Sequence, residues 1–245
     1  MGIQGKLTKA QLGYCLPVDA PLYERLPFFY KGVNMLIYEY VTDADAAAAL
    51  LPSQLELTDP PTVTLIFAEY PWSTLGPYNE VAQSLKCTYN GQPMSYAVRL
   101  HVTADSAMSA GREIAGFPKK MADIAFTKGD LYLATIDRPP GLRLCSATFR
   151  PTQVAPIPLP WTLPFVCLRL IPSPENNAPP SLLQLVGTEW VFESGEIWSG
   201  QGSFQYTGAS DFDPYHKLPA RQILSSMLFM GDMRVAAPGR ILENL

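Results

Sequence analysis

The sequence predicts a mainly β protein with minor α structure, folded as an antiparallel β-barrel or sandwich. Short runs of β-branched and aromatic residues recur along the chain, and turn-forming residues separate nearly all of them. The 245 residues include 24 prolines, and proline is rare inside helices and central strands. The composition therefore indicates many short elements joined by stiff turns, and a chain of this length can form one all-β domain.

The N-terminal part of the chain predicts an irregular segment, two strands and a helix. Residues 1–30 are interrupted by proline and glycine, and predict an irregular lead-in to a single domain covering 1–245. Strands are expected at 33–41 and 62–70, because both runs are rich in β-branched and aromatic residues. A short helix over 46–51 should lie between them, capped by a threonine–aspartate segment and stopped by proline.

A hairpin is the clearest local prediction. Asn90-Gly91 separates two strand-like runs, 80–88 and 94–103, and this dipeptide is a strong signal for a tight turn between antiparallel strands. Simple alternation along the second run places its side chains on two faces. One face would carry Tyr96, Val98, Leu100 and Val102. The opposite face would carry Ala97, Arg99 and His101.

The rest of the chain continues in the same pattern. Residues 71–78 predict a turn-rich loop. Further strands are expected at 122–126, 131–136, 142–147, 165–171, 182–192, 196–206 and 223–229. We find no internal repeat and no linker that would divide the chain.

Charge and composition exclude several classes of function. The net charge is −4 and the pI about 5.2, so binding to nucleic acid or to anionic membranes is not expected. The most apolar stretch, 159–171, contains two prolines and an arginine, and is too short and broken to span a bilayer. The N-terminus lacks the apolar core of a signal peptide. We expect a cytoplasmic protein whose four widely spaced cysteines are free thiols.

Common catalytic and cofactor motifs are absent. The sequence contains no complete Gly-x-Gly-x-x-Gly, no phosphate-binding loop and no Gly-x-Ser-x-Gly elbow. The two histidines, His101 and His216, have no metal-ligand spacing. We therefore expect neither a cofactor nor a metal.

One segment carries a pattern that suggests chemistry. Lys119 and Lys120 follow Phe117-Pro118 and stand between apolar segments. They could be solvated lysines at the entry of a strand. Alternatively, one of them is a neutral amine near pH 7 that attacks a carbonyl. Lowering a lysine pKa from about 10.4 to about 7 requires roughly 4–5 kcal/mol of destabilisation of the ammonium.

Burial and a neighbouring cation are the two routes to such a pKa. If the two lysines lie on an extended segment, their side chains point to opposite faces, so their ammonium groups are far apart. We therefore expect desolvation of Lys119 to be the larger effect, with Phe117, Phe126 and nearby strand residues as candidate walls.

The lysine segment is similar to that of the acetoacetate decarboxylase family. The resemblance rests on Gly-Arg-Glu at 111–113, on an aromatic residue and Pro-Lys-Lys at 117–120, and on Tyr-x-Glu at 78–80. Looser matches follow in the C-terminal half. The resemblance implies an antiparallel barrel-like fold, a homo-oligomer, and a Schiff base on Lys119. It also implies that Lys120 is the neighbouring cation, the route known for acetoacetate decarboxylase, and that Glu80 lies in the pocket.

Two positions depart from the family pattern. The decarboxylases carry a pocket arginine where this chain aligns Val33, and a second pocket glutamate where it aligns Leu65. An arginine is a natural partner for a substrate carboxylate. His101, on the strand before the lysine motif, could be a replacement polar group, or it could be a partly exposed strand histidine.

Three functions remain open from the sequence. The first is decarboxylation of a small β-keto acid through an imine on Lys119, with Glu80 moving the proton. The second is a pyruvate-type aldolase–dehydratase that uses the same lysine. The third is a non-catalytic barrel that binds a small ligand. The expected partner in the first two is a small keto-acid substrate.

Overall fold

The structure is a computed structural model that describes residues 2–156, 163–236 and 239–245. These residues form a mainly β protein, as predicted, with 15 strands in one sheet. The strands are β1 Phe28–Val41, β2 Glu56–Leu57, β3 Thr62–Tyr70, β4 Trp72–Ser73, β5 Tyr78–Tyr89, β6 Gln92–Val102, β7 Lys119–Met121, β8 Asp123–Thr127, β9 Tyr132–Asp137, β10 Arg143–Val154, β11 Phe165–Ile171, β12 Leu182–Thr188, β13 Trp190–Tyr206, β14 Gln222–Val235 and β15 Arg240–Asn244. The helical segments are η1 Lys9–Gln11, α1 Ala44–Ala48, α2 Asp105–Ala110, η2 Gly111–Ala115 and η3 Tyr215–Lys217.

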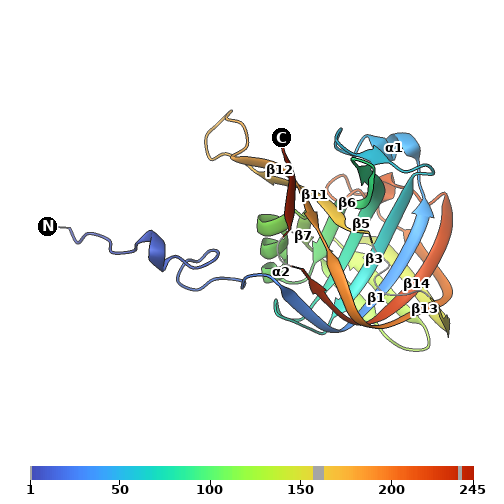
Figure 1. Cartoon of the computed structure of the whole chain (residues 1–245). Coiled ribbons are helices and arrows are strands. Elements are labelled where there is room, and N and C mark those ends of the chain that lie inside the picture. Colours follow the sequence, from blue (N-terminus) through green and yellow to red (C-terminus); the bar gives the residue numbers. More distant parts are fainter. Residues whose placement is uncertain (1, 157–162, 237–238) are drawn as a thin grey trace.

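The sheet is strongly curved, but the described strands do not close it (Figure 1). Hydrogen bonds join the strands in the order β15-β12-β11-β6-β5-β3-β1-β14-β13-β10-β9-β8, with β2, β4 and β7 attached to this path. The pairs β6–β11 and β6–β7 are parallel, so the sheet is mixed. The predicted antiparallel pairing therefore holds for the other strand pairs, but the barrel closure is not seen among the described strands. A helical crossover through α2 and η2 brings β7 back beside β6, as a parallel pair requires.

The predicted hairpin is confirmed. Strands β5 and β6 are antiparallel, and Tyr89 pairs with Gln92 across the turn. Asn90 and Gly91 have φ values of 50° and 74°, as a two-residue hairpin turn with two positive φ angles requires. This turn begins the pairing of β5 with β6 that places Glu80 opposite Val102.

The predicted alternation along β6 holds only near its end. Gln83 pairs with Arg99 and Ser84 pairs with Ala97, so the ladder skips Val98. This bulge adds one residue to β6 and moves the preceding side chains to the other face. Ala97 therefore packs in the same core cluster as Leu100, although simple alternation had assigned them to opposite faces.

Other regions also differ from the sequence prediction, including the short strands β2, β4 and β15, which were not predicted. The predicted strand 182–192 ends at Thr188 and resumes at Trp190, where the chain leaves β12 and enters β13. β13 then continues through Gly195, whose φ of 137° suits glycine at the register shift that follows Phe192. Helices α2 and η2, which precede the lysine motif, were not predicted.

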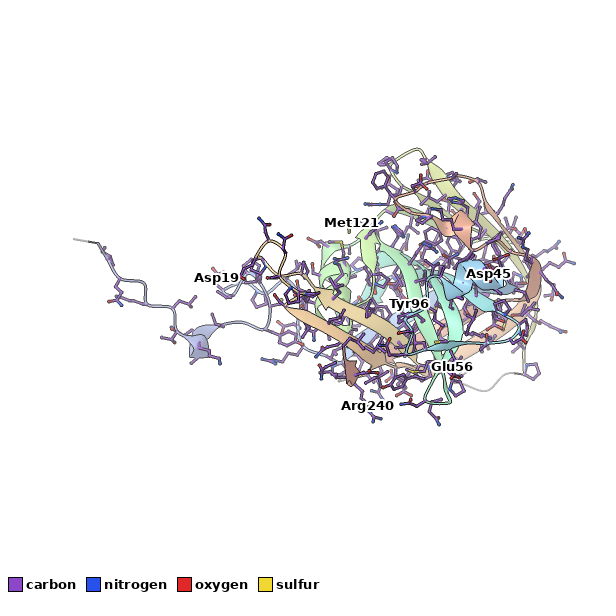
Figure 2. The ribbon with its side chains drawn as sticks, turned by 90° about the horizontal axis from the view of Figure 1, so that it is seen from above. Asp19, Asp45, Glu56, Tyr96, Met121 and Arg240 are labelled. Atoms are coloured by element: carbon purple, nitrogen blue, oxygen red, sulfur yellow. The ribbon has the colours of Figure 1, made fainter. Side chains whose placement is uncertain are left out.

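The N-terminal elements follow the prediction with shifted boundaries. Asp43 caps α1 by accepting a hydrogen bond from the Ala46 backbone, and the helix starts two residues before the predicted one. β1 already begins at Phe28. The segment before it, which includes Asp19, leads away from the sheet as an extended arm (Figures 1 and 2).

The sheet buries side chains on both of its faces. Along β1, Val33, Met35 and Ile37 belong to one core cluster, whereas Leu36 and Tyr38 belong to another. The first cluster also contains aromatic residues from β5, β11 and β13. An apolar interior therefore lies beside β6 and β7.

The cysteines and the most apolar stretch of the sequence can now be placed in the structure. The four cysteines are free, as predicted. In the described part of the chain, no helix has both the length and the apolar character needed to cross a membrane. Part of the apolar stretch 159–171 lies outside the described residues, and the rest forms β11.

Candidate active site

Lys119 is the first residue of β7 and lies opposite Leu100 of β6. The chain reaches this strand through Gly116, whose φ is 80°. A Cβ atom on Gly116 would lie 2.4 Å from the Cα of Arg169, so both the backbone angle and the space require glycine. This turn ends η2 and directs the Lys119 side chain into the interior.

Lys119 meets a buried carboxylate. Its side chain is 9% exposed, that of Glu80 is 2% exposed, and Nζ lies 2.7 Å from Glu80 Oε2. Among the described residues, Oε2 has no well-directed hydrogen bond, so the contact is a close ion pair rather than an aligned hydrogen bond. Glu80 comes from β5, where it pairs with Val102 of β6. The two neighbouring strands thus bring the lysine and the glutamate together.

Three tyrosines surround this pair. Tyr70 donates a hydrogen bond to Glu80 Oε1 over 3.4 Å, and Tyr78 donates to the Tyr30 hydroxyl over 3.3 Å. Burial raises the pKa of each of these tyrosines, so their hydroxyls stay protonated and can donate hydrogen bonds at neutral pH. They are neutral polar groups in an otherwise apolar setting.

A cavity of about 40 Å³ lies beside the amine. A cavity needs a volume of roughly 10–15 Å³ to hold one water molecule, so this cavity can hold a small molecule. Lys119 and Glu80 are the only charged residues among its described lining. Its apolar walls include Leu26, Phe28, Leu75, Phe117, Trp190 and Met233. The Lys119 Nζ lies 5.6 Å from the centre of the Phe117 ring.

Helix η2 packs directly on the lysine stem. A Cβ atom at Gly111 would lie 2.7 Å from Lys119 Cδ and 2.8 Å from Cε. Arg112, the next residue, donates a hydrogen bond from Nη1 to the Lys119 carbonyl over 3.1 Å. Glu113 accepts a hydrogen bond from the Tyr23 hydroxyl. Gly111 and Arg112 therefore contact Lys119, whereas neither charged side chain of the Gly-Arg-Glu segment lines the cavity.

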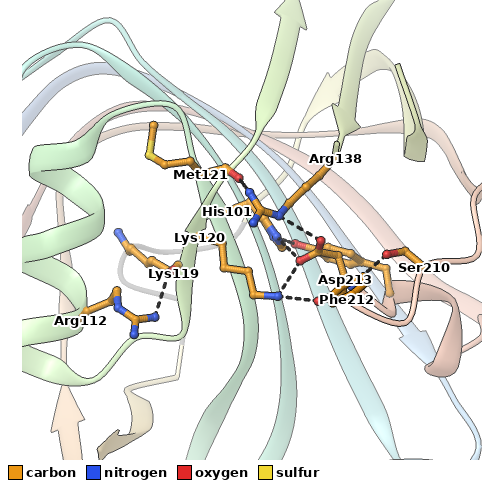
Figure 3. Close-up of polar contacts among 10 residues, drawn as sticks. His101, Arg112, Lys119, Lys120, Met121, Arg138, Ser210, Phe212 and Asp213 are labelled. Atoms are coloured by element: carbon orange, nitrogen blue, oxygen red, sulfur yellow. Dashed lines mark hydrogen bonds and ion pairs between the residues drawn. The ribbon is translucent and has the colours of Figure 1, made fainter. Parts of the chain in front are cut away.

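Lys120 points to the opposite face of β7, as alternation predicted (Figure 3). Its side chain is 42% exposed, and Nζ lies 2.8 Å from Asp213 Oδ1. It also donates a hydrogen bond to the Phe212 carbonyl. The two lysines therefore have separate carboxylate partners, and Lys120 shares Asp213 with Arg138.

His101 shares this second face. The residue is 1% exposed; Nε2 lies 2.9 Å from Asp213 Oδ1 and Nδ1 lies 2.8 Å from the Tyr215 hydroxyl. Burial lowers its pKa to about 4, against the hydrogen bond and charge of Asp213. The neutral ring donates through Nε2 and accepts through Nδ1. His101 does not line the Lys119 cavity.

The remaining sequence candidates lie away from the amine. Val33 packs in the same core cluster as Phe117 but does not line the cavity. Leu65 and Phe126 pack in the other cluster. Strand β1 contributes Phe28 and Tyr30 to the lining, and β3 contributes Tyr70.

Sequence reasoning did not find Tyr30, Tyr70 or Asp213. Tyr30 precedes the β1 position that was compared with the family arginine, and Tyr70 stands at the end of β3. Their contacts with the site depend on strand pairing, for which the sequence contains no local signal. Asp213 is separated from Lys120 by 93 positions.

Comparison with known proteins now decides the family. The sequence model described as "Acetoacetate decarboxylase (ADC)" matches residues 15–243. The chain belongs to the acetoacetate decarboxylase family. Decarboxylase DEC1 of Cochliobolus heterostrophus is 30% identical over 94% of this chain and 95% of its own length. Acetoacetate decarboxylase of Clostridium botulinum is 27% identical over 94% of both chains.

Solved structures of acetoacetate decarboxylase-like proteins share the fold. Acetoacetate decarboxylase from Legionella pneumophila superposes with a TM-score of 0.85 at 23% identity, covering 100% of this chain and 99% of the other. The enduracididine biosynthesis enzyme MppR in complex with pyruvate gives a TM-score of 0.81 at 20% identity, covering 96% and 98%. Family membership supports a lyase of the decarboxylase type.

Gly111→Ala tests the packing of η2 on the lysine. The new methyl group would push Cδ and Cε of Lys119 away from their present position, while the helix itself tolerates alanine. We expect a loss of about 10²-fold in decarboxylase activity, because misplacing a reacting group by about 1 Å has effects of this size. Thermal unfolding should be nearly unchanged. Gly129→Ala is the matched control, since the nearest atom to its Cβ would be 3.8 Å away; equal activities of the two variants would contradict the expectation.

The buried histidine predicts a pH dependence of stability. The folded-state pKa of His101, about 4, lies below the ordinary value of about 6.5, so protonation favours the unfolded chain. This contribution, about 3 kcal/mol, is fully present above pH 6.5 and is lost as the pH falls to 4. Denaturant unfolding at a series of pH values measures it.

The variant His101→Gln separates the contribution of His101 to the pH dependence of stability from those of the other titrating groups. Asp213, Lys120, Arg138 and Tyr215 surround the His101 ring, and all remain in His101→Gln. The difference in unfolding free energy between wild type and variant should therefore shrink between pH 6.5 and 4. Two parallel curves would show that His101 does not titrate as expected.

Proposed function

We propose that this protein decarboxylates a small β-keto acid through an imine on Lys119, with Glu80 as the proton shuttle. The observation that supports this most directly is the buried contact between Lys119 Nζ and Glu80 Oε2, 2.7 Å apart, inside a small, mostly apolar cavity. An amine and a carboxyl group at this distance can pass one proton between them without changing the total charge of the cavity.

The proposed steps use these two groups throughout. Glu80 takes a proton from Lys119, and the neutral amine attacks the ketone carbon. Glu80 then returns the proton as water is lost, which gives a protonated imine. The bond from the adjacent carbon to the carboxylate then breaks; its electron pair moves to the imine nitrogen, and CO₂ and an enamine form. Protonation of the enamine carbon, through Glu80, restores the imine. Hydrolysis releases the ketone and the free amine.

Decarboxylation is favoured by the way the carboxylate charge changes during the reaction, although the described lining residues include no arginine of the kind that the family's decarboxylases carry. A carboxylate in an apolar cavity loses its hydration, and its charge disappears from the carboxyl group when CO₂ leaves. An aldolase–dehydratase that acts on pyruvate must hold the carboxylate throughout the reaction, for which arginine is the usual partner. Among the described lining residues, the side-chain donors are the hydroxyl groups of three tyrosines and Thr188, the indole N–H of Trp190, and the amine of Lys119 itself. The names of the relatives, decarboxylases in both cases quoted, agree with this choice.

Borohydride trapping tests the imine and separates the three possible functions. We expect borohydride with acetoacetate to add one reduced adduct to the Lys119 peptide, identified by mass, and CO₂ to be released when borohydride is absent. Lys119→Arg should abolish both, because a guanidinium does not form an imine. Lys128→Arg is the matched control, since that lysine forms an exposed ion pair with Glu69.

The other outcomes point to the alternatives. A pyruvate adduct without CO₂ release from acetoacetate would favour the aldolase–dehydratase. No adduct with either keto acid would favour a binding protein and would overturn the proposal.

Glu80→Gln tests the proton shuttle. Glutamine keeps the size of the side chain but cannot carry the proton, so we expect kcat to fall about 10²- to 10⁴-fold. The reduced adduct should still form, slowly, on Lys119. Steady-state CO₂ release gives kcat, and near-wild-type turnover would remove Glu80 from the mechanism. Glu69→Gln, at an exposed ion pair, is the control.

A further inference from the structure

The cavity beside Lys119 comes close to the surface along one border. Most of its lining is buried, including Lys119 and Glu80. The described lining residues that are partly exposed are Leu26, Gly111, Ile114, Val235 and Gly239. They belong to the segment before β1, to η2, and to the chain where β14 ends and β15 begins. This border is therefore where a small molecule can enter the cavity and leave it.

Residues 13–27, which we call the strap, carry Leu26 across this border on the way to β1 (Figure 1). The strap belongs to no strand of the sheet. Its backbone hydrogen bonds to described residues stay within it, as in the 2.9 Å bond that the Gly13 N–H donates to the Val18 carbonyl. Side-chain contacts therefore hold the strap to the rest of the described structure. Segments held in this way open more easily than segments bonded into a sheet.

Tyr23 is the main anchor of the strap. It is 6% exposed, whereas its neighbour Leu22 is 38% exposed. Its ring packs in the same core cluster as Phe117, and its hydroxyl donates a hydrogen bond to Glu113 Oε2 on η2. Burial and this hydrogen bond raise the pKa of Tyr23, so the hydroxyl remains protonated and can donate at neutral pH. Among the described residues, Glu113 has no other side-chain hydrogen bond or ion pair.

This hydrogen bond lies next to the cavity wall on both sides. Tyr23 precedes Leu26 by three residues in the strap, and Glu113 directly precedes Ile114 in η2. Leu26 and Ile114 both line the cavity, and both pack against the same core cluster. Releasing Tyr23 from Glu113 would free Leu26 to move away from η2 and would widen the border.

We propose that the strap is a lid over the Lys119 cavity, with the Tyr23–Glu113 hydrogen bond as its latch and Leu26 as the residue that covers the border. In the closed state, Leu26 helps to keep water away from Lys119 and Glu80, as closing loops do in many active sites. In the open state, the keto acid enters between the strap and η2. This inference rests on the proposed function for the identity of the molecule that enters.

The first experiment measures how open the cavity is in the absence of any keto acid. Full-length protein is acetylated lightly with acetic anhydride, and the labelling of Lys119 is divided by that of Lys128, whose side chain is 46% exposed. Tyr23→Phe removes the hydroxyl and keeps the ring. We expect the ratio to rise roughly threefold or more, because a weaker latch leaves the strap open for a larger part of the time. An unchanged or lower ratio would overturn the inference.

Two comparisons tie this change to the latch. Tyr14→Phe is the matched control, because Tyr14 packs edge-on against Tyr23, with ring centres 5.9 Å apart, but its hydroxyl has no hydrogen bond to a described residue. Its ratio should equal that of the wild type. Lys86, whose side chain is 29% exposed and pairs with Glu39, reports on the sheet. A rise in Tyr14→Phe, or a parallel rise at Lys86, would count against a latch at Tyr23.

A double variant tests whether Tyr23 and Glu113 act together. Glu113→Ala removes the acceptor from an exposed position of η2, and it should raise the Lys119 ratio about as much as Tyr23→Phe. The double variant should rise no further, because either change alone already breaks the one hydrogen bond. Increases that multiply in the double variant would show that the two residues act separately, which contradicts the latch.

The second experiment asks whether the strap admits the substrate. The second-order rate constant for borohydride trapping of acetoacetate on Lys119 should rise in Tyr23→Phe along with the acetylation ratio. Faster acetylation without faster trapping would refute entry of the keto acid beneath the strap. Failure of the proposed function has a different signature, since acetoacetate would then leave even the wild type unlabelled, and the acetylation ratio would still test the lid.

Discussion

The arrangement of the site depends on one geometric constraint, the two-residue period of an extended strand. Because Lys119 and Lys120 are neighbours on β7, they cannot share a face. One enters the apolar cavity beside Glu80, and the other meets Asp213 on the opposite side. The parallel pairing with β6 adds Leu100 to the first side and His101 to the second. Two environments of different polarity are thus separated by the thickness of one strand.

This separation has an electrostatic consequence. Moving two charges out of water is costly, and a buried pair is kept only when its partners lie close together. Lys119 and Glu80 meet this condition, but with few other polar groups around them. Transfer of a single proton converts their ion pair into a neutral amine and a neutral acid. The Asp213 carboxylate on the other face instead accepts hydrogen bonds from several donors, which favour its ionised state and hold it in a fixed position.

Much of the fold could be predicted from the sequence, because its signals are local. The Asn90-Gly91 turn requires positive φ at both residues, and the period-two runs identify most strands. The bulge at Val98 could not be predicted, because it depends on which residues of β5 lie opposite. The same limit applies to Leu65, which the sequence comparison placed at a pocket position. Which face of β3 a residue occupies depends on the pairing of the strand, and in the structure Leu65 packs in the core cluster away from the cavity.

The sequence predicted the part of the site that lies in one short segment. It did not predict the part that distant strands bring together. The lysine motif identified Lys119 and the direction of Lys120, whereas the tyrosines and Asp213 come from β1, β3 and the loop before η3. This division also has a chemical meaning. The position of Lys119 follows from the pairing of β7 with β6, but most of the residues that line the cavity come from other strands and from the helices α2 and η2. Substitutions in those walls can therefore change the substrate while the lysine keeps its position, so one scaffold can support different keto-acid reactions.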